Sequence, residues 1–126
     1  MRRPLLLLLA VAAAGPASAQ SAAGLWRTEP ADTGAFLHVR IAPCAGTDRL
    51  CGVVDEVVGP AEIDITGDVM IRDMAPDGPG AWSGGTIWAP DEDKTYRARM
   101  RLQGGGLRVE GCVLVICRGQ TWTRLD

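Results

Sequence analysis

The fold follows from one stretch of the sequence, Tyr96-Arg-Ala-Arg-Met-Arg-Leu-Gln-Gly-Gly-Gly-Leu-Arg-Val-Glu-Gly-Cys112. Its first half alternates apolar residues with arginines, and a period of two residues is typical of a strand with one face in a core and the other in water. Three glycines then turn the chain, because glycine adopts positive φ angles without steric cost. Alternation resumes from Leu107 to Gly111, so the stretch predicts an antiparallel hairpin.

The same rhythm extends along the rest of the chain. Further strands are expected at Gly24 to Thr28, Phe36 to Ala42, Cys51 to Val58, Val69 to Met74, Ala81 to Trp88 and Gln120 to Arg124. Clusters of Gly, Pro and Asp separate them, and only the segment from residue 61 to 68 shows no readable pattern. About eight short strands with short turns predict an all-β fold, a small antiparallel up-and-down barrel. An immunoglobulin-like sandwich is the alternative.

The N-terminus has the pattern of a secretory signal peptide. Arg2 and Arg3 precede an apolar run that is too short to span a bilayer, and Ala17-Ser-Ala19 supplies the small residues that signal peptidase requires. We expect cleavage after Ala19, which leaves residues 20–126 as a single β-barrel domain of 107 residues. The expected location is the periplasm or the medium. No second long apolar run follows, so no membrane span is expected.

The mature chain is mildly acidic. Removing Arg2 and Arg3 from a chain with a formal net charge of −2 leaves a net charge of about −4. Nucleic acid is therefore not an expected partner, because phosphate binding requires clustered Lys and Arg. Arg97, Arg99 and Arg101 form the one basic stripe, which we interpret as the solvated face of a strand.

Four cysteines, Cys44, Cys51, Cys112 and Cys117, all lie in the exported part of the chain. An oxidising compartment pairs an even number of cysteines, and three connectivities are open. Chain entropy favours a crossed pair, at about 4.5 kcal/mol against roughly 2–2.5 kcal/mol for a local one. Geometry favours local disulfides, because cysteines that face each other across a hairpin already have suitable Cα separations. A four-cysteine zinc site is the rival, which the exported context disfavours.

An ordered series of motifs resembles one bacterial family. Gly24-Leu-Trp-Arg-Thr28, Ile41-Ala-Pro-Cys44, Trp82-Ser-Gly-Gly-Thr-Ile-Trp88 and Gln120-Thr-Trp-Thr-Arg124 are similar to motifs of the secreted family called domain of unknown function 2147. The resemblance covers nearly the whole mature chain and implies export and a β fold. The family has no established activity, so it implies no catalytic residue. The short middle of this chain, Gly59 to Asp68, departs from the family pattern.

A second resemblance is to lipocalins. Those barrels begin with a Gly-x-Trp strand and end with an arginine packed over the tryptophan, and Gly24-x-Trp26 and Arg124 match these positions here. The resemblance implies that the indole closes one end of a lipocalin-like barrel. The guanidinium would stack on its face, an interaction of about 0.5–2 kcal/mol.

No group of residues points to catalysis. The single histidine, His38, lies on the polar phase of its strand, and neither Ser21 nor Ser83 lies in a nucleophile-elbow context. Asp91-Glu-Asp93 lacks the spacing of a calcium loop, and paired cysteines leave no free thiol. We therefore expect a protein that is not an enzyme and holds no metal or other cofactor.

The candidate binding site is the barrel interior, because an eight-stranded barrel is either filled by its own side chains or holds one small ligand. By alternation Tyr96 and Met100 point inward, and Trp82 and Trp88 are expected to join them from one strand face that they share with Gly84. These aromatics and Met100 are the predicted ligand-binding residues for a small apolar or amphipathic molecule. The alternative is an envelope interaction or structural protein with a filled barrel. A lined cavity would favour the first, and a filled interior with an exposed apolar patch the second.

Overall fold

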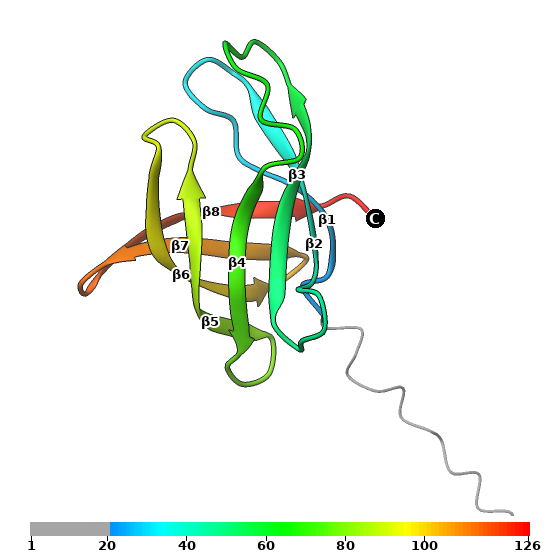
Figure 1. Cartoon of the computed structure of the whole chain (residues 1–126), viewed down its shortest axis with the longest axis vertical. Coiled ribbons are helices and arrows are strands. Elements are labelled where there is room, and N and C mark those ends of the chain that lie inside the picture. Colours follow the sequence, from blue (N-terminus) through cyan, green and yellow to red (C-terminus); the bar gives the residue numbers. More distant parts are fainter. Residues whose placement is uncertain (1–20) are drawn as a thin grey trace, which may run out of the picture.

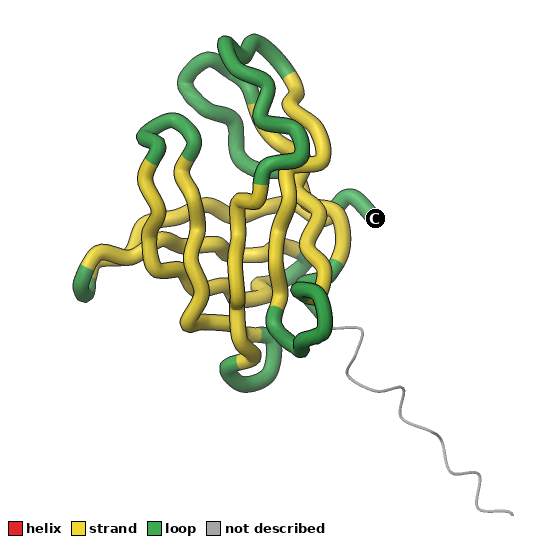
Figure 2. Tube along the Cα trace, viewed as in Figure 1, coloured by secondary structure: helices red, strands yellow, loops and turns green. Residues whose placement is uncertain are grey.

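The computed structural model describes residues 21–126, so the expected signal peptide and its cleavage site lie outside the described residues. Eight antiparallel strands close into a barrel in sequence order, with no helix in this region (Figure 1, Figure 2). The strands are β1 (Gly24–Arg27), β2 (Phe36–Pro43), β3 (Leu50–Val58), β4 (Val69–Pro76), β5 (Ala81–Ala89), β6 (Lys94–Gln103), β7 (Gly106–Val113) and β8 (Ile116–Arg124). The predicted all-β, up-and-down barrel is confirmed.

Alternating strand direction gives the barrel two distinct ends. The β2–β3, β4–β5 and β6–β7 turns lie at one end together with both termini of the barrel, and we call this the plug end. The β1–β2, β3–β4, β5–β6 and β7–β8 connections lie at the other, the loop end. In Figure 1 the loop end is at the top and left, where the β7–β8 hairpin leans away from the other three connections.

The barrel closes through a short ladder between its first and last strands. Trp26 pairs with Arg124 and Arg27 with Thr123, and the Leu125 amide donates to the Leu25 carbonyl at 2.8 Å. Beyond the ladder, the Glu29 carboxylate accepts the Thr121 amide at 2.7 Å. This bond continues the closure past the end of β1, as far along β8 as Thr121.

The interior is packed with the barrel's own side chains. Trp26, Trp122 and Leu107 are at most 1% exposed, and the Trp122 indole N–H donates to the Gln120 side-chain oxygen at 3.0 Å. Every buried polar side-chain atom among the described residues has a hydrogen-bond partner. The rest of the core consists of Ala22, Val39, Ile41, Leu50, Val54, Met70, Ile71, Met74, Trp82, Ala98, Met100 and Val109.

A β-bulge explains why both phases of β3 carry a carboxylate. His38 pairs with Glu56, whereas the next residue, Val39, pairs with Val54. Asp55 is the extra residue, and it lies exposed beside the exposed Glu56. One inserted residue changes the phase of a strand, so two neighbouring acidic residues both reach water while Val54 stays in the core.

A second bulge corrects the predicted facing of β5. Ser83 pairs with Arg99 and Gly85 with Ala98, so Gly84, at φ 79°, is left over. The predicted shared face of Trp82 and Trp88 is therefore wrong, because the extra residue reverses the phase between them. Trp82 faces the core opposite Met100, whereas Trp88 pairs with the exposed Thr95.

Both local disulfides are present. Cys44 is bonded to Cys51 with a Cα separation of 5.1 Å, and Cys112 to Cys117 with a separation of 4.1 Å. Cys112 and Cys117 are direct partners in the β7–β8 ladder, which continues one pair further. The second disulfide therefore spans the hairpin just below its tip and leaves a two-residue turn.

The segment without a readable pattern is a loop. It connects β3 to β4, and its Gly67 amide donates to the Val54 carbonyl at 2.8 Å. The Asp64 carboxylate accepts the Thr66 hydroxyl at 2.6 Å and the Thr66 amide at 3.0 Å, and these bonds lower the pKa of Asp64. Ile65 packs against the core, so the loop is anchored by this apolar side chain and by its backbone hydrogen bond to Val54.

Candidate functional site

The plug end is sealed by an indole and a guanidinium. The Trp26 side chain is fully buried, and its ring N–H donates to the Ala22 carbonyl at 2.8 Å. The Arg124 guanidinium carbon lies 4.3 Å from the centre of the Trp26 ring. The guanidinium also donates to the carbonyls of Ser21 at 2.7 Å and Ala23 at 3.1 Å. The chain before β1 is thus held across the barrel end, and a ligand has no entrance there.

Two of the predicted ligand-binding residues belong to the packed core. Trp82 is 9% exposed and Met100 is 2% exposed, and they face each other across the β5–β6 ladder. The neighbouring inward pair is Gly85 and Ala98, of which Ala98 is 6% exposed. A Cβ on Gly85 would lie 2.6 Å from the Met74 sulfur. The space beside Gly85 is therefore occupied by the backbone of β4 and by the Met74 side chain.

The other two predicted residues hold the β5–β6 turn. Tyr96 is half-buried on the inward phase, and its hydroxyl donates a short hydrogen bond to the Glu92 carboxylate, which raises the pKa of the phenol. Trp88 lies on the outward phase, and its indole N–H donates to the Asp93 carboxylate at 2.9 Å. Each aromatic residue thus binds one carboxylate of the acidic turn, which gives Glu92 and Asp93 a structural role.

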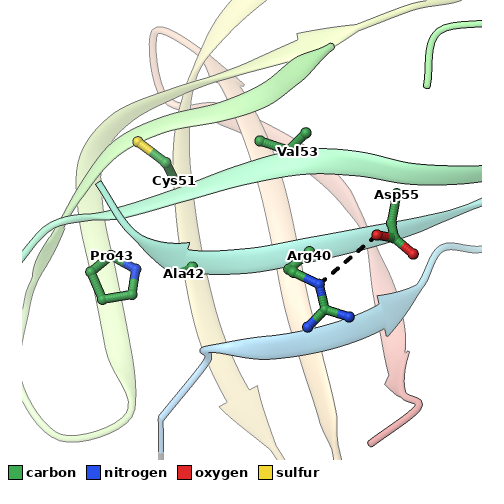
Figure 3. A pocket seen from close by; sticks show the side chains of 6 residues that line it. All are labelled: Arg40, Ala42, Pro43, Cys51, Val53 and Asp55. Carbon is green, nitrogen blue, oxygen red and sulfur yellow. Dashed lines mark ion pairs between the residues drawn. The ribbon is translucent and has the colours of Figure 1, made fainter. Parts of the chain in front are cut away.

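Two hollows of the described surface are lined by no residue of the buried core. One, of about 220 Å³, lies over the outer face of β2 and β3 (Figure 3). It is crossed by a loose ion pair between Arg40 and Asp55 at 3.9 Å. The other, of about 260 Å³, lies at the β3–β4 loop between Val57 and Thr66. Both are smaller than the roughly 300–1,000 Å³ typical of small-molecule sites, and no predicted ligand-binding residue lines either.

His38 and the Cys44–Cys51 pair, which could in principle serve a catalytic or metal site, are engaged in structural contacts. The His38 Nδ1 atom lies 3.6 Å from the Glu56 carboxylate on the outer surface. Cys44, Cys51 and Asp73 place three potential metal-ligand atoms within 4.8 Å of one another. However, both sulfurs are bonded to each other, and a disulfide offers no thiolate to a metal.

The feature that the sequence reasoning missed is the tip of the β7–β8 hairpin. Four consecutive aliphatic residues protrude there: Val113 is 56% exposed, Leu114 95%, Val115 93% and Ile116 63%. We call these residues the hairpin tip. The signal in the sequence is a run of four apolar residues at a turn, where polar residues are the rule unless the site is functional.

The class of the protein follows from this geometry: it is a small lipocalin-like barrel with a sealed plug end. The family described as "Uncharacterized protein conserved in bacteria (DUF2147)" matches residues 24–124, and the chain belongs to this family. The fold is similar to that of protein HP1028 from the human pathogen Helicobacter pylori, which is described as a member of the lipocalin family. The TM-score is 0.66 at 14% identity, over 84% of each chain, so this similarity concerns the fold alone. No curated protein matches the sequence.

None of the described residues belongs to a helix that is long and apolar enough to cross a membrane.

Proposed function

We propose that this protein is an exported, non-enzymatic envelope protein that binds its partner with its outer surface at the loop end. The observation that carries the proposal is the filled interior. The predicted ligand-binding residues Trp82 and Met100 are packed in the core, and neither of them lines one of the two hollows. A filled barrel together with the exposed hairpin tip supports binding through the surface.

Export is supported by the signal-peptide pattern and by the cysteine chemistry. All four cysteines form disulfides, which persist in an oxidising compartment such as the periplasm. The same bonds leave no free thiol as a nucleophile. His38 lies beside a surface carboxylate rather than beside a hydroxyl nucleophile, which supports a role in binding rather than catalysis.

The second candidate is a carrier of one small apolar ligand. It is favoured by the lipocalin-like fold and by a group of half-buried apolar residues near the loop end, which pack on the core without being enclosed by it. These residues are Leu37, Val57, Ile65 and Ile87. Val57 also lines the hollow at the β3–β4 loop, but no buried core residue does, so a ligand that reached Met100 would have to displace these residues.

Titration of the mature protein with an environment-sensitive fluorescent fatty acid separates the two candidates. The filled-barrel proposal predicts no saturable fluorescence change, because an enclosed apolar volume is needed to hold the probe. Saturable one-to-one binding would contradict the proposal if it is lost in Ala98→Val, which adds volume to the interior. The matched control is Val53→Ser, on the outer face of β3, which should leave any interior binding unchanged.

A further inference from the structure

The apolar sequence of the hairpin tip does not stabilise the fold. Two-residue hairpin turns favour Asn-Gly or Gly-Asn sequences, because the first or both of the central positions adopt positive φ angles. Here Leu114 has φ 54°, in the left-handed region that disfavours residues with a side chain. Its side chain is also 95% exposed. The turn thus combines an unfavourable backbone with exposed apolar surface, and a polar turn would fold better on both counts.

The hairpin holds the tip rigidly away from the barrel. The Cys112–Cys117 disulfide lies directly below Val113 and Ile116, the last pair of the ladder. Figure 1 shows the β7–β8 hairpin projecting sideways, with its tip far from the acidic β5–β6 turn. The apolar residues therefore form a convex, preordered point rather than a groove for an extended peptide or helix.

Two arginines lie beside the base of this point. Arg97 on β6 pairs with Cys112, and Arg118 on β8 pairs with Gly111. Neither arginine forms an ion pair with any residue between 21 and 126. The nearby carboxylate, Glu110, is taken by Arg99 at 2.8 Å and Arg108 at 3.7 Å. The base of the tip therefore carries free positive charge, although the mature protein is acidic overall.

We propose that the hairpin tip inserts into the surface of an anionic phospholipid bilayer, with Arg97 and Arg118 at the phosphate groups. At a rise of about 3.3 Å per residue, Leu114 lies roughly 10 Å beyond the level of Gly111 and Arg118. Amphipathic helices at a membrane surface bury their apolar face about 5–10 Å into the boundary between headgroups and acyl chains, and the hairpin tip has the length to reach the same depth. The spacing thus places the aliphatic residues below the headgroups and the guanidinium groups among them.

A second copy of the chain fits this surface less well. A standard protein interface buries about 800 Å² per partner, whereas a convex tip of four side chains offers roughly a few hundred Å². The free arginines would also approach their symmetry-related counterparts in a dimer formed through this point, and like charges repel. A phospholipid surface suits both the convex apolar tip and the positive charge at its base, because the surface is deformable and its phosphates are negative.

The test is flotation of the oxidised mature protein with vesicles of phosphatidylethanolamine and phosphatidylglycerol. The wild type is expected to float with these vesicles and to float less with phosphatidylcholine vesicles or at high salt. Replacing the turn by Leu114→Gly with Val115→Asn puts glycine at the position with positive φ, which is a favourable hairpin sequence, so this variant should fold. It is expected to lose about tenfold or more of its vesicle partitioning, because two aliphatic side chains leave the bilayer.

The matched control is Ile63→Ser, which removes another exposed aliphatic residue, 73% exposed, from the β3–β4 loop. It is expected to float as the wild type does. The proposal is overturned if the wild type fails to float, if the turn variant floats equally well, or if sedimentation shows a wild-type dimer that the turn variant abolishes. This inference rests on the proposed surface role, but its failure is separable. Absence of both flotation and fatty-acid binding would leave the surface role with a different partner, whereas fatty-acid binding in the interior would contradict the surface role itself.

Discussion

Trp26→Ala is expected to lower the free energy of unfolding by about 3–5 kcal/mol, as for other large buried aromatic residues. The side chain is fully buried, and its indole N–H donates to Ala22 at 2.8 Å. Its ring also lies 4.3 Å from the Arg124 guanidinium carbon. Truncation of Trp26 therefore opens a cavity, removes the hydrogen bond to the segment before β1 and leaves Arg124 without its stacking partner. Urea denaturation of the oxidised protein measures the change.

Trp88→Ala is the matched control for this prediction, because it removes the same side chain from the outer face of the barrel. Its indole has one hydrogen bond, to Asp93 at 2.9 Å, and the residue is only half-buried. We expect a loss of about 1 kcal/mol or less. Equal losses for the two tryptophan variants would mean that Trp26 does not plug the barrel.

Gly119→Ala is expected to cost about 2–4 kcal/mol, because the site has no room for a methyl group. A Cβ on Gly119 would lie 1.9 Å from the Val109 carbonyl oxygen and 2.8 Å from the Glu110 Cα. Backbone atoms of the paired strand cannot yield to it as a flexible side chain would, so β8 must move away from β7. Denaturation midpoints of the variant and the wild type give the difference.

The control for the glycine prediction is Gly105→Ala, in the β6–β7 turn. A Cβ there meets no atom within 4 Å, and its φ is not in the left-handed region. That substitution should change stability by about 0.5 kcal/mol or less. If Gly119→Ala were as well tolerated as Gly105→Ala, the close approach of β7 and β8 would be wrong.

The strand order and the disulfide pairs could be predicted from the sequence because both depend on local patterns. Alternation in the stretch from Tyr96 places Ala98 and Met100 inside and their arginine neighbours outside, as the structure has them. Cys112 and Cys117 flank a turn short enough to make them ladder partners. In a meander such local information determines the topology, since each strand pairs with its neighbour in sequence.

The facing of Trp88 could not be predicted in the same way, because a β-bulge adds one residue and reverses the phase. The glycines at 84 and 85 signalled an irregularity but not which of them would be unpaired. The alternation of apolar and polar residues also could not predict that the interior is filled, because this depends on how Met74 reaches the space beside Gly85. Volume complementarity of this kind depends on how side chains from different strands pack together, which the alternation within one strand does not encode.

The exposed hairpin tip could have been predicted, since its signal is present in the sequence. Cys112-Val-Leu-Val-Ile-Cys117 places four aliphatic residues between two cysteines that pair locally. A loop this short cannot fold its middle residues back into the barrel. Local pairing therefore requires Leu114 and Val115 to be exposed, and their apolar character then indicates a contact with something outside the chain.

The central claim is that the barrel is filled by its own side chains. Native mass spectrometry of protein purified from its own host, from the periplasm in which we propose it resides, tests this claim most directly, because it reports any molecule carried in the interior. We predict the bare mass of the chain that begins at Gln20, reduced by two hydrogens for each of two disulfides. A stoichiometric small-molecule adduct that persists in several preparations would contradict the claim and favour the ligand carrier.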